Sequence, residues 1–76
     1  MTKKLPRLTA DQIIKAIKKL GFEETRSKGS HRIYKSRGNS KRIVVPYHSG
    51  KIIHSKITKD IIRIIDISLD KFIELT

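Results

Sequence analysis

The residues best suited to chemistry in this chain lie around one histidine, His31. The run Gly29-Ser30-His31 follows Lys28 and precedes Arg32, so an imidazole stands between two cations directly after a glycine. An imidazole, with a reference pKa of about 6.5, exchanges protons at neutral pH, and one positioned group of this kind contributes roughly 10²- to 10⁴-fold to a rate. The chemistry that this pattern offers is proton transfer beside a bound anion, but from these residues alone a polar residue that starts a strand is the favoured interpretation of His31.

One imidazole is sufficient to cleave RNA, because the 2′-hydroxyl of RNA itself is the nucleophile. A protein that removes the 2′ proton and stabilises the phosphorane cleaves the chain without a metal ion. Gly29 allows the backbone to approach a phosphate closely, and the amides of Gly29 and Ser30 can donate to its oxygens. Lys28 and Arg32 would offset the developing charge. An RNA held at His31 could therefore be cleaved without a metal ion, and the product would carry a 2′,3′-cyclic phosphate.

The remaining histidines and the tyrosines allow two interpretations each. His48 is either a second acid or base or a structural residue that holds its loop by hydrogen bonds, and the structural role is favoured. Because His31, His48 and His54 lack close ligand spacing and the chain has no cysteine, we expect neither a metal nor another cofactor. Tyr34 and Tyr47 are candidates for stacking on exposed bases, and they are equally typical of half-buried sheet residues.

Positive charge is concentrated in the middle of the chain. Lys and Arg number 18 against 7 Asp and Glu, which gives a formal charge of +11, and no carboxylate separates Glu24 from Asp60. Such a block favours polyanion binding over mere solubility, and no segment has the composition of an interfacial membrane helix. The residues expected to bind RNA are Arg26, Lys28, Gly29, Ser30, Arg32, Lys35, Arg42 and Lys51.

The length of 76 residues leaves room for one domain and excludes doubly wound sheets and barrels. The longest apolar run, Ile43 to Val45, is far shorter than the ~20 residues needed to cross a bilayer, and Met1 to Pro6 contain no apolar leader segment. We therefore expect a cytoplasmic protein with one domain over residues 1–76. Its oligomeric state stays open.

The elements that must position these residues can be read from local patterns. Thr9 and Gln12 form a capping box, which predicts a helix over about 10–20 that ends at Gly21. Three strands, Phe22–Ser27, His31–Lys35 and Lys41–Pro46, follow with turns at 28–30 and 37–40, which is the pattern of an antiparallel meander. In the middle strand Ile33 alternates with polar Arg32 and Tyr34, as expected of a sheet with one wet face.

A second helix is predicted over about 56–66, behind a cap at Ser55 or Thr58, because isoleucines recur at helical spacing. A strand over 61–67 is the alternative, but the charges at Lys59, Asp60, Arg63 and Asp66 fit a helical face better. Ser68 would cap a short last helix over about 69–75. The isoleucine stripes are expected to form core rather than a groove for a partner.

Taken together, these residues resemble the HicA (YcfA-like) toxin family. The resemblance rests on a helix that ends in Gly-Phe, on Lys28-Gly29-Ser30-His31 at the strand turn and on Val44-Val45-Pro46-Tyr47-His48 after the sheet, and it covers about residues 8–67. It implies an α+β fold like that of a double-stranded-RNA-binding domain. It also implies the toxin component of a type II toxin-antitoxin system, an mRNA interferase with His31 as catalytic histidine and a HicB antitoxin as partner.

Two other functions remain as alternatives. A non-catalytic double-stranded-RNA-binding module would share the same order of helices and strands. A DNA-binding regulator is disfavoured because isoleucines occupy much of the second helix, which leaves few side chains able to read base edges. An acidic antitoxin laid over the sheet and His31 would mask a nuclease of this charge by excluding RNA.

Overall fold

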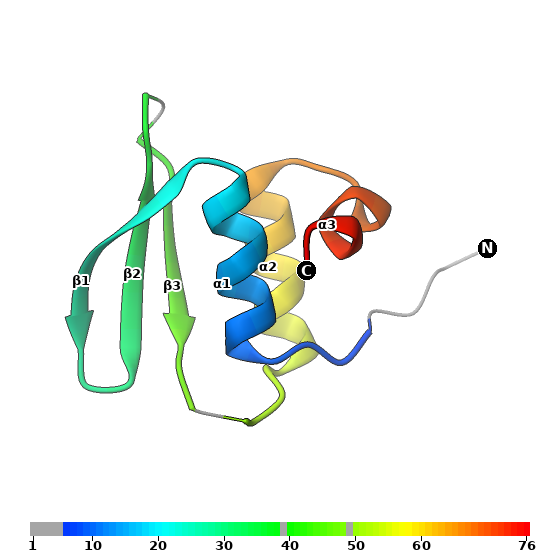
Figure 1. Cartoon of the computed structure of the whole chain (residues 1–76), viewed down its shortest axis with the longest axis horizontal. Coiled ribbons are helices and arrows are strands. Elements are labelled where there is room, and N and C mark those ends of the chain that lie inside the picture. The colour runs from blue at the N-terminus through cyan, green and yellow to red at the C-terminus, as the bar shows by residue number, and fades with distance from the viewer. Residues whose placement is uncertain (1–5, 39, 49) are drawn as a thin grey trace.

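The computed structural model describes residues 6–38, 40–48 and 50–76, and it places three helices to one side of a single sheet (Figure 1). The order of elements confirms the predicted α+β fold, and every predicted boundary lies within one residue of the observed one. The elements are α1 (Ala10–Lys19), β1 (Phe22–Lys28), β2 (His31–Ser36), β3 (Arg42–Pro46), α2 (Ser55–Ile65) and α3 (Leu69–Leu75).

Helix α1 begins and ends as its sequence predicts. The side chain of Thr9 accepts a hydrogen bond from the Gln12 amide at 3.3 Å, and Gln12 Oε1 accepts one from the Thr9 amide at 2.9 Å. Past the end of the helix Gly21 has a φ of 95°, in the region that favours glycine. Between these ends the helix buries one apolar stripe: Ala10, Ile13, Ile14, Ala16 and Ile17.

The sheet is an antiparallel meander in the order β1-β2-β3, and its pairing register defines two faces. Tyr34 pairs with Ile43 and Arg32 pairs with Val45, so these four side chains point toward the helices. Tyr34, Ile43 and Val45 are fully buried. We call this side the inner face and the opposite side the outer face.

One prediction about the sheet is wrong. Ile33 was expected to be the inward residue of the middle strand, but Tyr34 is fully buried and Ile33 is half-buried on the outer face. The alternation of side chains is correct, and only the choice of face is reversed. A large ring fills the space beneath the helices, and a period of two does not say which set of residues turns inward.

Helix α2 starts one residue earlier than predicted, and its cap is neither Ser55 nor Thr58. His54 caps it, because His54 Nδ1 accepts a hydrogen bond from the Lys56 amide at 3.1 Å. Ser55 is the first helical residue, and Thr58 is buried inside the helix at 2% exposure. The preference for Ser and Thr at caps reflects a side-chain acceptor near the first amides, and a histidine ring nitrogen supplies the same acceptor here.

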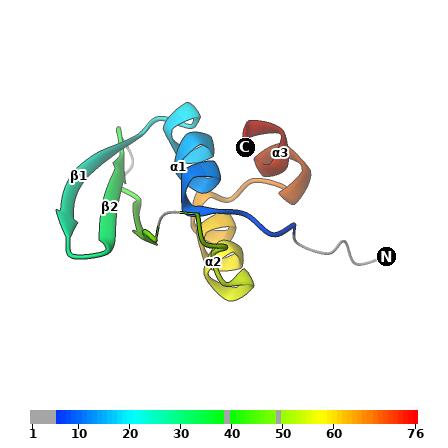
Figure 2. The ribbon, with the colours of Figure 1, turned by 60° about the horizontal axis from the view of Figure 1, so that its bottom comes forward.

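Helix α3 completes the core from the side of α1 that lies away from the sheet (Figure 2). Ser68 caps it as predicted, with Oγ accepting from the Lys71 amide at 3.2 Å, and Phe72 is fully buried. None of the helices in the described ranges is long and apolar enough to cross a membrane. Met1 to Leu5, Asn39 of the predicted turn and Ser49 of the following loop lie outside the described residues.

Candidate functional site

His31 is the first residue of β2 and lies exposed at one end of the sheet. It pairs with Lys28 of β1 on one side and with Pro46 of β3 on the other. The turn before it is held in two ways. Gly29 has a φ of 58°, which a side chain would strain, and the Ser30 carbonyl accepts a hydrogen bond from the Tyr47 amide beyond β3. The imidazole is therefore presented from a defined position between two strands.

Cations share the outer face with His31. The register places Lys28 opposite His31, Arg26 opposite Ile33, and Lys35 opposite Arg42. A hollow of about 310 Å³ on this face is lined by Thr25, Arg26, Ile33, Lys35 and Arg42. Four of the residues predicted to bind RNA thus lie on the face that carries His31, and Gly29 and Ser30 form the turn beside it.

A β-bulge at Thr25 makes this arrangement compatible with the core. The register shifts between Glu24 and Arg26, and Thr25 Oγ1 donates a hydrogen bond to the Ile33 carbonyl at 3.3 Å. In a regular strand Phe22 and Arg26 would face the same side, because they are four residues apart. The extra residue lets Phe22 enter the core at 4% exposure while Arg26 stays on the outer face. Sequence reasoning missed this bulge.

At the opposite end of the hairpin, one cation is paired with a carboxylate. Arg37 Nη2 lies 2.7 Å from Glu23 Oε1, in an exposed ion pair at the end of β2 far from His31. Lys28 and Arg26, by contrast, lie at the same end of β1 as the turn before His31, and the nearest acids along that strand are Glu23 and Glu24. Positive charge therefore extends along the outer face, from Lys28 and Arg26 at the His31 end to Lys35 and Arg42 at the other end.

Arg32 and Lys51 are not brought to this group. Arg32 belongs to the inner face, and its guanidinium carbon lies 3.8 Å from the centre of the Tyr47 ring, a cation–π contact. Lys51 is exposed in the loop after β3, where its amide donates to the His48 carbonyl at 3.1 Å. The expectation that Arg32 flanks His31 as a neighbouring cation is not met, because successive strand residues point to opposite faces.

Neither tyrosine offers a free ring for stacking. Tyr34 is fully buried, and its hydroxyl has no hydrogen-bond partner among the described residues. Burial raises the pKa of Tyr34, and the negative charge of Glu24 adds to the rise. Tyr47 is half-buried beneath the Arg32 guanidinium. The expectation of base stacking on Tyr34 is wrong, because the ring is part of the core.

The other two histidines have separate surroundings. His48 is exposed in the loop after β3. His54 acts as the N-cap of α2, a role that sequence reasoning did not assign. In the described parts of the chain, no three His, Asp or Glu side chains stand close enough together to hold a metal ion.

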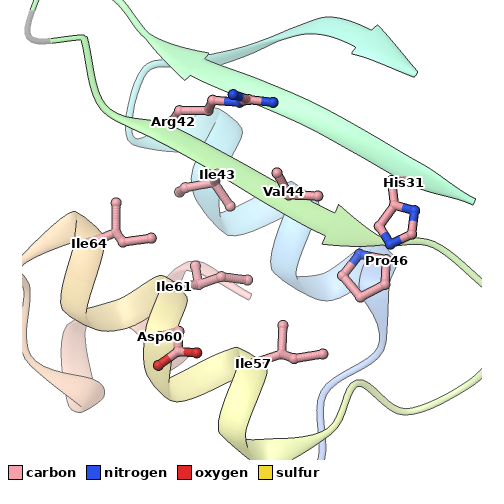
Figure 3. Close-up of a pocket in the computed structure, with 9 residues that line it drawn as sticks. All are labelled: His31, Arg42, Ile43, Val44, Pro46, Ile57, Asp60, Ile61 and Ile64. Carbon is pink, nitrogen blue, oxygen red and sulfur yellow. The ribbon is translucent and has the colours of Figure 1, made fainter. Parts of the chain in front are cut away.

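An apolar groove of about 570 Å³ runs along β3 and begins at His31 (Figure 3). Ile57, Ile61 and Ile64 point from α2 toward β3, with His31 and Pro46 near one end and Arg42 near the other. The expectation that the isoleucine stripes are core alone is therefore only partly correct. Ile61 is buried, whereas Ile64 is 40% exposed in this groove, which we call the β3–α2 groove. Its other lining residues are Ile43, Val44 and Asp60.

This site places one exposed imidazole and a row of cations on a single surface. Such a surface suits a polyanion that lies across the strands with a reacting atom at the His31 end.

Comparison with known proteins assigns the chain to a family. Residues 10–67 match the family model described as HicA toxin of bacterial toxin-antitoxin, so the match includes every element except α3. No curated protein matches the chain.

Proposed function

The chain belongs to the HicA toxin family of bacterial toxin-antitoxin systems, and on this premise we propose that it is an endoribonuclease that cleaves mRNA with His31 as its catalytic residue. The observation that carries the proposal is that exposed His31 lies on the same cationic face of the sheet as Lys28 and Arg26. A buried ring, or one turned away from Arg26 and Lys28, would be incompatible with this activity.

The proposed reaction uses the nucleophile that RNA itself provides. His31 takes the proton of the 2′-hydroxyl while the 2′ oxygen forms a bond to the adjacent phosphorus. The bond from phosphorus to the 5′ oxygen then breaks, and the proton held by the ring can be returned to that oxygen. The products are a 2′,3′-cyclic phosphate and a 5′-hydroxyl, and the step needs neither metal nor other cofactor.

The cations of the outer face would hold the RNA backbone in place. Arg26, Lys35 and Arg42 line the hollow beside Ile33, and Lys28 stands next to His31 in the pairing register. The Gly29-Ser30 turn carries amides that can donate to the phosphate at the reacting end. In this proposal Lys51 contacts RNA from the loop, and Arg32 acts indirectly by fixing Tyr47.

The partner that follows from the family is an antitoxin, and we propose that it is a HicB-like protein. A protein of charge +11 is most easily masked by an acidic partner that occupies the outer face and excludes RNA. Because the proposed substrate is mRNA, the proposed site of action is the cytoplasm.

The test is an RNA-cleavage assay with purified protein in EDTA, comparing the wild type with His31→Ala. We expect His31→Ala to lower the cleavage rate by about 10²- to 10⁴-fold while RNA affinity changes little. His48→Ala serves as the matched control, because it removes an exposed imidazole from the loop instead.

The ends of the product decide the chemistry. A 2′,3′-cyclic phosphate supports attack by the 2′-hydroxyl, whereas a 5′-phosphate with a 3′-hydroxyl would refute it. A wild-type protein that binds double-stranded RNA and never cleaves it would favour the non-catalytic RNA-binding module instead.

A further inference from the structure

The β3–α2 groove has an open strand edge as one wall. β3 is the last strand of the sheet, and no element of the described chain pairs with it on the side away from β2. A strand edge with free amides and carbonyls is a template for pairing with another extended chain.

The register shows which backbone groups are free. The Ser36 amide donates to the Lys41 carbonyl, and the Tyr47 amide donates to the Ser30 carbonyl. Between these two positions, hydrogen-bonded and non-hydrogen-bonded residue pairs alternate along β2 and β3. Residues 43 and 45 consequently use their backbone groups on β2. The backbone amides and carbonyls of Arg42 and Val44 point away from β2, toward the open edge. Pro46 at the end of the strand has a carbonyl but no amide hydrogen.

The opposite wall of the groove is apolar except for Asp60. Ile57, Ile61 and Ile64 of α2 point toward the strand edge, and Val44 and Ile64 are 39% and 40% exposed. An edge strand next to a helix that lines the groove with aliphatic side chains is an arrangement that can bind extended peptides, with one set of side chains inserted against the helix.

We propose that the β3–α2 groove binds an extended segment of the antitoxin as an additional antiparallel strand beside β3, with apolar residues alternating with acidic ones. The pairing register fixes this pattern. Residues bonded to Arg42 and Val44 share their outer face, where Arg42 and Lys35 favour carboxylates. The intervening residues face α2, where the isoleucines favour aliphatic side chains.

Two other occupants fit the groove less well. A second copy of the chain would bring another charge of +11 against the same cations. An RNA strand has no extended peptide edge to pair with Val44, and aliphatic walls with the carboxylate of Asp60 disfavour a phosphate.

Occupancy of the groove would also affect His31. The imidazole lines the groove beside Pro46, so a strand that docks there lies against the proposed catalytic ring. Inhibition by this route rests on the proposed function, whereas the pairing itself does not.

The test uses an end-blocked nine-residue peptide in which valine alternates with glutamate, titrated into ¹⁵N-labelled protein. We expect the Arg42 and Val44 amides to shift and to become protected from hydrogen exchange. Two N-methylated peptides provide the matched control on an unaltered protein. Methyl groups on the glutamate amides should abolish binding, because those amides face β3, and the same number on the valine amides should not.

A protein variant tests the same contact from the other side. Val44→Pro removes one outward amide at a position that does not bond to β2, and Pro46 shows that such a position accepts proline. We expect the peptide to bind about tenfold more weakly, the effect of one lost hydrogen bond. Val44→Ala keeps the amide and controls for the lost side chain.

The outcomes separate this inference from the proposed function. Equal binding of both methylated peptides, or shifts confined to the cations of the outer face, would overturn the strand pairing. The strand pairing would also be overturned if single-stranded RNA shifted the amide resonances of Val44 and Ile64 and the peptide did not. RNA cleavage is measured on the free protein without peptide. A protein that does not cleave RNA can therefore still bind the peptide, and a protein that does not bind the peptide can still cleave RNA.

Discussion

The two faces of the sheet are built from alternating residues of the same strands, yet they have opposite properties. Along β2, Tyr34 and Arg32 point inward and are packed or stacked, whereas His31, Ile33 and Lys35 point outward. The inner face is closed by helices, and the outer face carries the proposed chemistry. Because each strand residue belongs to one face only, the residues that stabilise the core can be changed separately from those proposed to bind and cleave RNA.

The largest expected effect compares two neighbours in β2. Tyr34→Ala removes a fully buried ring and should lower the free energy of unfolding by about 3–5 kcal/mol, whereas Ile33→Ala, half-buried on the outer face, should cost less than about 2 kcal/mol. Urea unfolding measures both. A larger loss for Ile33→Ala than for Tyr34→Ala would mean that the faces are assigned the wrong way round.

A smaller effect separates two arginines of the sheet. Arg26→Gln should reduce the salt dependence of single-stranded RNA binding by about 0.7 in log-log slope, the value for one lost phosphate contact. Arg32→Gln removes the same charge from the inner face and should leave the slope nearly unchanged. It should instead lower stability by about 0.5–1 kcal/mol, because the contact with Tyr47 is lost. Identical slopes for the two variants would show that the face on which an arginine lies does not decide whether it contacts a phosphate.

The smallest effect concerns the hydroxyl group of Tyr34. Because burial raises the pKa of Tyr34, the neutral ring is favoured in the folded state, and its contribution to stability is present below pH of about 10. As the pH rises through the folded-state pKa, that contribution is lost. Tyr34→Phe should therefore flatten the fall in stability above pH of about 10 and change stability at pH 7 by less than about 1 kcal/mol. Parallel profiles for wild type and variant would contradict this.

Local signals in the sequence predicted the elements well because each signal acts over a few residues. The Thr9–Gln12 capping box and Gly21 define α1, and Gly29 marks the turn before His31. The α+β order follows from the spacing of these signals. The cap of α2 was predicted at Ser55 or Thr58 and lies at His54, because serine and threonine are more common helix caps than histidine.

The candidate site was only partly predictable. His31 and the outward cations Arg26, Lys28, Lys35 and Arg42 were all selected from the sequence, but their common face was not. It depends on the turn that sets the register and on the bulge at Thr25 that returns Phe22 to the core. The β3–α2 groove could not be predicted, because its shape depends on how α2 packs beside the edge of β3, which local sequence patterns do not determine.

The amino-acid sequence by itself determined where helices, strands and turns lie, how strongly positive the middle of the chain is and which histidine is the candidate for catalysis. Those properties depend on nearest neighbours and on composition. Only the tertiary structure decided that Tyr34 rather than Ile33 enters the core, that Arg32 turns away from His31 and that β3 keeps an open edge beside α2. Each of these depends on which face of the sheet the helices cover, and packing between distant segments sets that choice.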